Sequence, residues 1–239
     1  MKTHDYEKNA KKYSEIGISN SYYMAFKDVP VLLEEYANEN MKFLDYGCGT
    51  GRSLRFIRNL GYKDIVGVDI SKDMIDKAKE MDALGNYRLI ENLKIPYLDK
   101  TFDVIFMSYV FLEVGEFNEI VKILQEFKRV LKDDGHIIFI TSIVKNIKDK
   151  WLSFSYDFPE NEKDLNHCQK LKLLIKDQNI IFYDFNWLEE DYKNAINEAD
   201  LNINKIHIPM GYDNEPYQWL SEKNIPYNYI FVLDKKRLN

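Results

Sequence analysis

The stretch FLDYGCGTGRS, residues 43–53, places Gly47, Gly49 and Gly51 directly after a short apolar run. Glycine loses more conformational entropy on folding than any other residue, so three glycines in five positions need a structural reason. The usual reason is a sharp turn in which the backbone passes close to a ligand. The stretch therefore predicts a strand that ends in a glycine-rich binding loop, followed by a helix.

Short apolar runs alternate with amphipathic segments through the middle of the chain. Strands are predicted at residues 42–46, 64–69, 87–91, 102–108 and 136–142. Helices are predicted at residues 52–61, 71–81 and 116–132. Ser71 is expected to be the N-cap of the second of these helices. This alternation is typical of an α/β protein with a doubly wound, Rossmann-like sheet that is mostly parallel and carries helices on both faces.

The start of the chain has a different pattern. Helices are predicted at residues 5–15 and 21–38, the second interrupted at Pro30, which cannot donate a helical hydrogen bond. We expect a single domain over the whole chain, with a helical lid in residues 1–40 and the cofactor-binding core in residues 41–142.

The alternation also breaks after the fifth predicted strand. Residues 143–185 are predicted to be an inserted substrate cap that ends in a β-hairpin at residues 170–185. A helix and two strands follow in residues 186–239, and Asn186 and Glu189 resemble a capping box at the start of that helix. The three elements are expected at residues 187–199, 201–208 and 227–233.

Composition limits the classes of partner. The net charge of −6 argues against a nucleic-acid surface, because neutralising phosphates needs clustered Lys and Arg. The longest apolar run, residues 104–112, is about half of a membrane span, and the first residues are too polar for a signal peptide. Cys48 and Cys168 are too far apart in sequence to suggest a disulfide framework or a metal site. We therefore expect a cytoplasmic monomer or homodimer that binds no metal, nucleic acid or membrane.

The spacing of the glycines limits the kinds of ligand that the loop could bind. It reads G-x-G-x-G, whereas a dinucleotide-binding loop reads G-x-G-x-x-G, and it has no P-loop lysine. Asp45, two residues before the first glycine, would repel a phosphate. Asp69 ends the second predicted strand, where an acidic residue accepts hydrogen bonds from ribose hydroxyls. The ligand should contain a nucleoside and carry positive charge, and S-adenosylmethionine fits that description.

Four stretches in order, FLDYGCGTG, VGVDIS, FDVIFMSYVFLEV and VLKDDGHIIFI, resemble successive motifs of the class I S-adenosylmethionine-dependent methyltransferases. The resemblance spans roughly residues 5–142 and is strongest to the small-molecule enzymes with an N-terminal helical lid. It implies a seven-stranded sheet whose last strand is antiparallel. It also implies S-adenosyl-L-methionine as cofactor, S-adenosyl-L-homocysteine as product, and methyl transfer to a nitrogen, oxygen or carbon of a small molecule.

The resemblance assigns cofactor contacts residue by residue. The glycine loop would wrap the methionine part, Asp45 would face its ammonium group and Asp69 would bind the ribose. Ile70 and Met74 would flank the adenine, and Glu91 stands where the family has Asp. The implied cofactor-binding residues are Tyr13, Tyr22, Asp45, Gly47, Cys48, Gly49, Thr50, Gly51, Asp69, Ile70, Met74, Glu91, Asn92 and Ser108. Helix capping is the alternative for Asp69, and packing is the alternative for the two lid tyrosines.

The acceptor pocket is expected between the fourth strand, the cap and the lid. Its predicted substrate-binding residues are Tyr109, Phe111, Trp151, Tyr156 and Phe158. Glu113 and His167 are the candidates for a catalytic base, with packing or helix capping and a surface position as their alternatives. An amine also loses its proton to water, so we expect no indispensable base.

Charge in the predicted cap bears on the acceptor. Four acidic residues and one lysine follow one another closely there, which favours an amine-bearing or neutral acceptor over an anionic one. They are Asp157, Glu160, Glu162, Lys163 and Asp164.

Other functions stay open at this point. A nucleic-acid or protein methyltransferase has the same cofactor motifs, although no added recognition domain is visible. A non-catalytic cofactor-binding protein is a second alternative. An NAD-dependent oxidoreductase is disfavoured by the spacing of the glycines.

Overall fold

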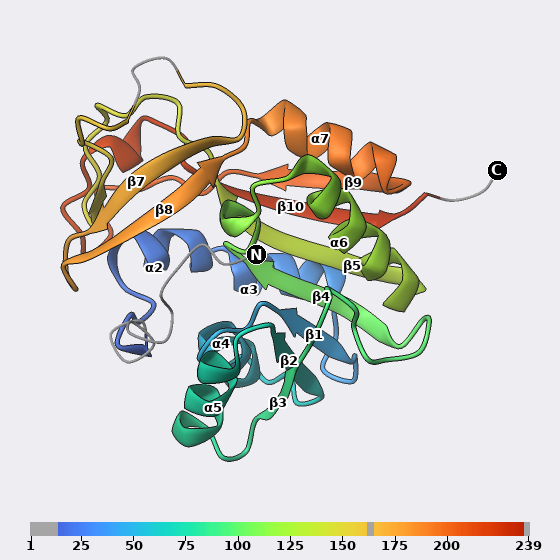
Figure 1. Ribbon diagram of the computed structural model, residues 1–239. Coiled ribbons are helices and arrows are strands. Elements are labelled where there is room, and N and C mark those ends of the chain that lie inside the picture. The colour runs from blue at the N-terminus through green and yellow to red at the C-terminus, as the bar shows by residue number, and fades with distance from the viewer. Residues whose placement is uncertain (1–13, 162–164, 237–239) are drawn as a thin grey trace.

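The computed structural model describes residues 14–161 and 165–236 (Figure 1). Tyr13 and most of the helix predicted at residues 5–15 lie outside the described residues. Three of the charged cap residues, Glu162, Lys163 and Asp164, lie outside them too.

A seven-stranded sheet of order β3-β2-β1-β4-β5-β10-β9 forms the centre of the molecule. Its strands are β1 (Phe43–Tyr46), β2 (Ile65–Asp69), β3 (Asn86–Leu89), β4 (Phe102–Ser108), β5 (Leu131–Ser142), β9 (Leu201–His207) and β10 (Asn228–Lys235). Strand β10 is antiparallel to both of its neighbours, and the strands from β3 to β5 pair in parallel. The predicted α/β fold, mostly parallel with an antiparallel last strand, is confirmed.

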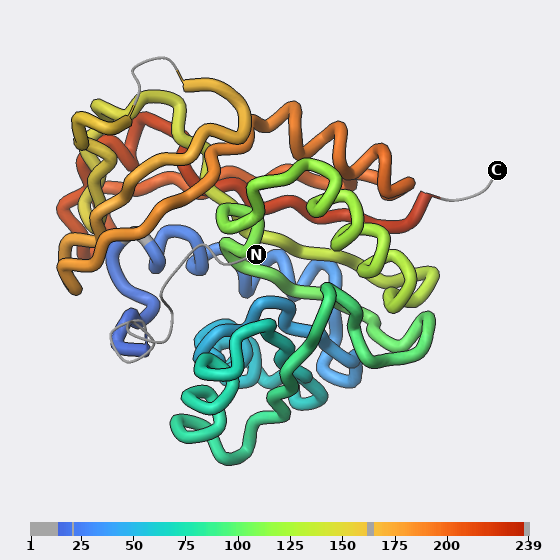
Figure 2. Tube along the Cα trace, in the orientation of Figure 1, coloured from blue at the N-terminus to red at the C-terminus, as the bar shows by residue number. Residues whose placement is uncertain are grey.

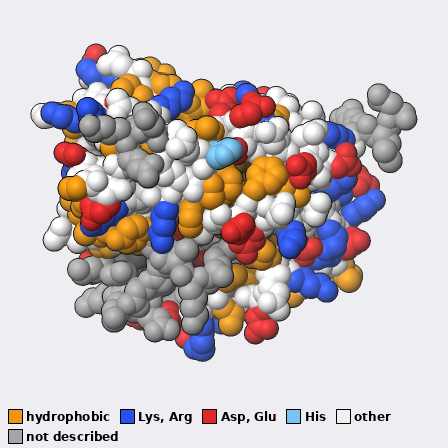
Figure 3. Space-filling model, turned by 45° about the horizontal axis from the view of Figure 1, so that its top comes forward, with side chains coloured by type: hydrophobic (Ala, Val, Ile, Leu, Met, Phe, Trp, Pro, Cys, Tyr) orange, Lys and Arg blue, Asp and Glu red, His pale blue; other side chains and the backbone are white. Residues whose placement is uncertain are grey.

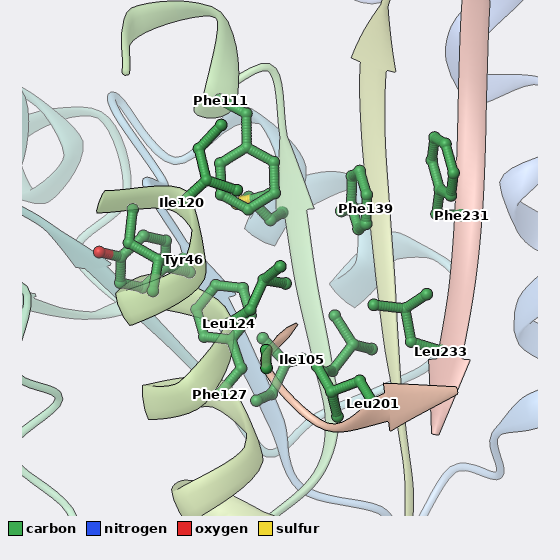
Figure 4. Close-up of a cluster of buried hydrophobic side chains, with 14 of the residues drawn as sticks. Tyr46, Ile105, Phe111, Ile120, Leu124, Phe127, Phe139, Leu201, Phe231 and Leu233 are labelled. Carbon is green, nitrogen blue, oxygen red and sulfur yellow. The ribbon is translucent and has the colours of Figure 1, made fainter. Parts of the chain in front are cut away.

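Helices cover both faces of the sheet. Successive side chains of a strand point to opposite faces, so apolar residues on both faces need a covering layer. Helices α6 (Phe117–Val130) and α7 (Glu189–Glu198) pack on one face, where Ile105, Phe139 and Phe231 are fully buried (Figure 4). The other face, with Val104 and Ile138, is covered by residues of four helices. They are α2 (Asn20–Phe26), α3 (Val29–Tyr36), α4 (Arg52–Asn59) and α5 (Lys72–Met81).

A second sheet of three strands, order β6-β7-β8, forms after β5. Its strands are β6 (Phe154–Ser155), β7 (Gln169–Ile175) and β8 (Ile180–Asn186). The predicted hairpin is present as β7 and β8, which pair antiparallel along their whole length. We call these three strands the cap sheet. Its chain, yellow to orange in Figure 2, lies at one end of the large sheet, and Asn20 of α2 donates a 2.7 Å hydrogen bond to Asp177 in its turn.

Several element boundaries differ from the predictions. The break between α2 and α3 falls at Lys27 and Asp28, and Pro30 lies in the first turn of α3, where its missing N–H is no loss. Helix α6 ends at Val130, so β5 begins five residues earlier than predicted. Two 3-10 turns, η1 (Phe111–Glu113) and η2 (Ser221–Lys223), were not predicted.

The predicted capping box at Asn186 is wrong. Helix α7 begins after Leu188, whose backbone N–H donates to Asp191 at 2.8 Å. Asn186 is 2% exposed and bonds both backbone groups of Val144 instead. Its amide therefore ties the end of the cap sheet to the chain that leaves β5.

The surface carries charges of both signs. Lys and Arg side chains are interspersed with Asp and Glu on the face shown in Figure 3. Within residues 14–161 and 165–236, no helix is both long enough and apolar enough to cross a membrane.

Candidate functional site

The glycine loop joins β1 to α4 at the carboxyl end of the sheet. Gly47, Gly49 and Gly51 all have positive φ, at +67°, +52° and +82°. A Cβ atom added at Gly47 would lie 2.2 Å from Cγ2 of Val110, and one added at Gly51 would lie 2.3 Å from the hydroxyl of Tyr87. Conformation and space both require glycine here, so the backbone itself forms the surface of the loop.

Asp69, the last residue of β2, holds this loop in place. One carboxylate oxygen accepts the N–H of Gly49 at 2.8 Å, and the other accepts the N–H of Ser71 at 2.8 Å. Burial raises the pKa of Asp69 above its ordinary value, and the backbone N–H groups oppose that rise. Each carboxylate oxygen can accept a second bond, so the group can anchor the loop and still receive ribose hydroxyls.

Asp45 lies at the end of β1 with 1% of its surface exposed. Its Oδ2 accepts a 2.6 Å hydrogen bond from Ser53, whereas its Oδ1 is buried with no hydrogen-bond partner among the described residues. Burial raises the pKa of Asp45 to about 7. A buried acceptor of this kind calls for a donor that the described residues do not supply. The oxygen beside a glycine cradle fits the ammonium group of S-adenosylmethionine, reached directly or through water.

The residues expected around the adenine are only partly accessible. Ile70 is 44% exposed although it is apolar, which leaves a face that a flat base can cover. Glu91 and Asn92 are also exposed, after the end of β3. Met74, in the first turn of α5, is 2% exposed. Its N–H donates a 3.3 Å hydrogen bond to the hydroxyl of Ser71, which caps the helix.

The side chains of two loop residues, Cys48 and Thr50, are buried in the protein. Cys48 is 4% exposed, and its sulfur is the nearest atom to a Cβ placed on Gly67. Thr50 is 3% exposed, and its carbonyl oxygen accepts a 2.6 Å bond from Arg55. Both backbone groups of Cys48 are also bonded, its N–H to Val68 at 3.0 Å and its carbonyl oxygen to the N–H of Gly51 at 2.8 Å.

The loop after β4 connects the glycine loop to a second space. Val110 packs against Gly47, since its side chain occupies the space that a Cβ atom on Gly47 would need. Tyr109 has a φ of +63°, a strained conformation for a tyrosine, and its hydroxyl donates to Asn228 at 3.0 Å. The ring of Tyr22 meets the ring of Tyr109 edge-on at 5.6 Å, and the guanidinium of Arg52 lies 4.2 Å from the Tyr22 ring centroid. Tyr22 therefore lies between the helix that follows the glycine loop and the space beyond Tyr109.

That space is a cavity of about 80 Å³ between the loop after β4, α2 and the cap sheet. Its walls are mostly aromatic and aliphatic, with two carboxyl groups. The lining residues are Tyr22, Tyr109, Leu112, Glu113, Ser153, Phe154, Leu173, Ile175, Phe182, Asp184 and Tyr227.

Three of the predicted pocket residues, Tyr22, Tyr109 and Glu113, line this cavity. Ser108 lies next to them at the end of β4. Phe111 does not line it, because its ring points into the main core beside Ile120 (Figure 4).

The predicted aromatic residues of the cap lie behind or outside the cavity wall. Trp151 is 1% exposed and packs against Phe154 and Tyr227, with ring centroids 5.5 and 4.8 Å away. Tyr156 is equally buried and its hydroxyl lies 3.1 Å from that of Tyr227. Phe158 lies 4.7 Å from the Lys172 ammonium on the outer side.

The predicted charged residues of the cap that the structure describes lie at the surface. The side chain of His167 is 72% exposed, and its Nδ1 lies 3.4 Å from Asp191. Asp157 is exposed, and Glu160 forms a 2.6 Å ion pair with Lys172. These three side chains therefore do not supply the charge of the cavity.

Asp184 is the functional candidate that the sequence reasoning missed. In β8 it shares a face with Ile180 and Phe182, at the two-residue spacing that sends side chains to one side of a strand. An aspartate at an inward position of a strand is costly to bury, which was the available signal. The partner strand places Leu171 opposite Asp184.

The two residues that carry the carboxyl groups of the cavity are both half-buried. Burial raises the pKa of Glu113 to about 8, with a further rise from the charge of Asp184. Burial also raises the pKa of Asp184 to about 7, opposed by the hydroxyl of Tyr156 at 3.4 Å. Among the described residues, no Lys, Arg or His forms an ion pair with either carboxylate. The other titratable groups that face them are the phenols of Tyr22, Tyr109, Tyr156 and Tyr227.

These raised pKa values predict a pH-dependent stability. A carboxyl whose pKa is higher in the folded state contributes stability when it is protonated in both states, and that contribution is lost as the pH rises through the folded pKa. We expect the apo protein to lose stability between about pH 4.5 and pH 8.5, and Glu113→Gln and Asp184→Asn to reduce that loss. Thermal melts across this range, with Asp157→Asn as the exposed control, measure it. A loss of equal size in all four proteins would contradict the assignment.

Known proteins resemble this chain in the region that forms the glycine loop and its surroundings. The sequence model of the methyltransferase-domain family matches residues 44–139, which include the glycine loop, Asp69 and the loop after β4. Malonyl-[acyl-carrier protein] O-methyltransferase of Hamiltonella defensa is 32% identical over 106 residues, covering 44% of this chain and 40% of that protein. Ribosomal protein L11 methyltransferase of Dictyoglomus thermophilum is 34% identical over 114 residues, covering 46% and 35%. This chain thus spans less than half the length of either relative.

The likeness to solved structures extends over almost the whole chain. A crystal structure of an S-adenosylmethionine-dependent methyltransferase from Clostridium acetobutylicum has a TM-score of 0.64 and covers 98% of this chain and 100% of its own. At 16% identity it establishes the fold alone. The family match, the cradle with its orphan acidic oxygen and this fold agree. Residues 44–139 thus match the methyltransferase-domain family, and the chain has the fold of the S-adenosylmethionine-dependent methyltransferases.

Proposed function

We propose that this protein transfers the methyl group of S-adenosylmethionine to a small molecule bound in the cavity under the cap sheet. One observation carries the proposal: the loop after β4 touches the glycine loop through Val110 and lines the cavity through Tyr109. When bound, the cofactor supplies an electrophilic methyl group whose carbon–sulfur bond breaks with its electrons going to sulfur. The acceptor side of the reaction therefore lies one residue from the cofactor side.

The contributions of the chain itself are binding, orientation and exclusion of water. Gly47, Gly49, Gly51 and Asp69 would hold the cofactor, with Asp45 near its ammonium group. Tyr22, Phe154 and Phe182 would close over the acceptor and keep water away. Holding two reactants in a productive arrangement is worth roughly 7–11 kcal/mol of the barrier, so positioning supplies much of the rate.

The size of the cavity favours a small acceptor. Its volume of about 80 Å³ admits a handful of water-sized groups, and the cap sheet covers it. A protein acceptor is the second candidate, because one relative is named for a ribosomal protein and another for an acyl-carrier protein. We also propose a cytoplasmic location. Both cysteines, Cys48 and Cys168, are free thiols, which is the usual state of cysteines in a reducing compartment.

The test of this function uses methyl-labelled cofactor. The purified protein is incubated with it and an extract of the source cells, and the products are separated by size before mass spectrometry. We expect the label in small molecules, and none with Asp69→Ala. Label confined to proteins or nucleic acids would overturn the small-molecule assignment, and no transfer in any fraction would favour a non-catalytic cofactor-binding protein.

A further inference from the structure

We propose that Glu113 and Asp184 form a recognition site for a basic nitrogen, so that the acceptor is an amine that binds as its ammonium ion and is methylated on nitrogen. This inference rests on the proposed methyl transfer. It stands on the position of the two carboxyl groups, which line one cavity from two neighbouring elements, Glu113 from η1 and Asp184 from β8.

The part of the chain that the structure describes offers these carboxyl groups no cationic partner. Glu215, by contrast, is a largely buried acid that has a cationic partner, Lys27 at 2.5 Å. Glu113 and Asp184 have no such cation among residues 14–161 and 165–236, and the phenol of Tyr156 at 3.4 Å is the hydrogen-bond donor recorded for Asp184. Removing two carboxylates from water is unfavourable unless a cation joins them. A ligand that brings the positive charge meets that requirement.

The rest of the cavity suits an organic cation. Tyr22, Tyr109, Phe154, Phe182 and Tyr227 line it, and aromatic faces attract ammonium groups that lie close to them. Leu173 and Ile175 add aliphatic surface for the carbon skeleton of the ligand. A carboxylate or phosphate in the same place would face two acids, so an anionic acceptor is excluded from this site.

Nitrogen methylation also needs somewhere for a proton to go. An ammonium ion has no free lone pair, so one of its protons must first leave, either to water or to a carboxylate oxygen of the pair. The pKa values of about 8 and 7 place both carboxyls in the range where they can take that proton at neutral pH. The nitrogen lone pair then forms the new N–C bond, and the product leaves again as a cation. Charge and atoms balance without another reactant.

The experiment compares three probes of nearly equal shape, phenethylamine, 2-phenylethanol and phenylacetate, on protein saturated with S-adenosylhomocysteine. Binding is measured as a shift in melting temperature and as a dissociation constant. We expect the amine to bind at least about tenfold more tightly than the alcohol, the carboxylate to bind most weakly, and Glu113→Gln and Asp184→Asn each to weaken amine binding by about tenfold or more. Asp157→Asn, an exposed acid of the same cap, should change nothing.

Two readouts separate this inference from the function on which it rests. If S-adenosylhomocysteine stabilises the protein and label reaches small molecules, but the three probes bind equally or not at all, the amine site is wrong and the methyltransferase stands. Products labelled on oxygen or carbon would also overturn it. If S-adenosylhomocysteine itself does not bind the wild-type protein, the proposed function fails first. Unchanged S-adenosylhomocysteine affinity in Glu113→Gln and Asp184→Asn shows that these variants are folded.

Discussion

Asp69→Ala is expected to weaken the binding of S-adenosylhomocysteine by about a hundredfold or more. The carboxylate has two tasks: it would receive the ribose hydroxyls, and it accepts the N–H groups of Gly49 and Ser71 at 2.8 Å. Hydrogen bonds to a charged group are worth roughly 1.5–3 kcal/mol each, and about 1.4 kcal/mol corresponds to a factor of ten in affinity. Loss of the ribose bonds alone therefore reaches the stated factor, and a loosened glycine loop adds to it.

The control for this variant lies at the other end of the same strand. Asp64 is exposed just before β2, so Asp64→Ala removes an equal charge without touching the loop. Titration calorimetry gives both dissociation constants, and melting of the free proteins shows whether Asp69→Ala is folded. Asp69→Asn keeps one acceptor oxygen and should fall between the two. Wild-type affinity in Asp69→Ala would remove Asp69 from the cofactor site.

Sequence patterns located the core of this molecule because local physics decides it. Apolar runs of strand length alternate with amphipathic helices, and each glycine of the loop has a positive φ that other residues rarely adopt. Ser71 caps its helix as predicted, through a side-chain bond within three residues. These features depend on neighbours in the sequence, so the fold and the cofactor loop were both predictable.

The acceptor cavity was less predictable because residues far apart in the sequence form it. Glu113 and Asp184 meet only after the cap sheet folds over the end of β4. Trp151 and Tyr156 were expected in the pocket for their aromatic rings, yet both are 1% exposed and lie behind its wall. A bare sequence does not show which side of a short strand faces a cavity. The acids that suggested an amine acceptor, Asp157 and Glu160, lie at the surface, and Asp184 supplies the charge instead.

Gly51→Ala is expected to have the second large effect, on both stability and cofactor binding. The new Cβ would lie 2.3 Å from the hydroxyl of Tyr87, and φ at this position is +82°. Tyr87 cannot move aside freely, because it is 4% exposed and its hydroxyl donates to Asp82 at 2.8 Å. Left-handed strain of about 1–2 kcal/mol and overpacking of about 1–3 kcal/mol together predict roughly 2–5 kcal/mol. For a chain of this length that is a fall in melting temperature of about 4–20 °C.

Two other glycines separate strain from collision. Gly61 has a φ of +107° but nothing within 4 Å of an added Cβ, so Gly61→Ala carries the strain alone. Gly17 has neither a positive φ nor a close neighbour, so Gly17→Ala should be neutral. We expect the melting temperature to fall in the order Gly17→Ala, Gly61→Ala, Gly51→Ala, and only the last variant to lose S-adenosylhomocysteine affinity. An equal fall in melting temperature in Gly51→Ala and Gly61→Ala, with cofactor binding intact in both, would contradict this. It would show that the loop tolerates a side chain and that packing against Tyr87 does not shape the cofactor site.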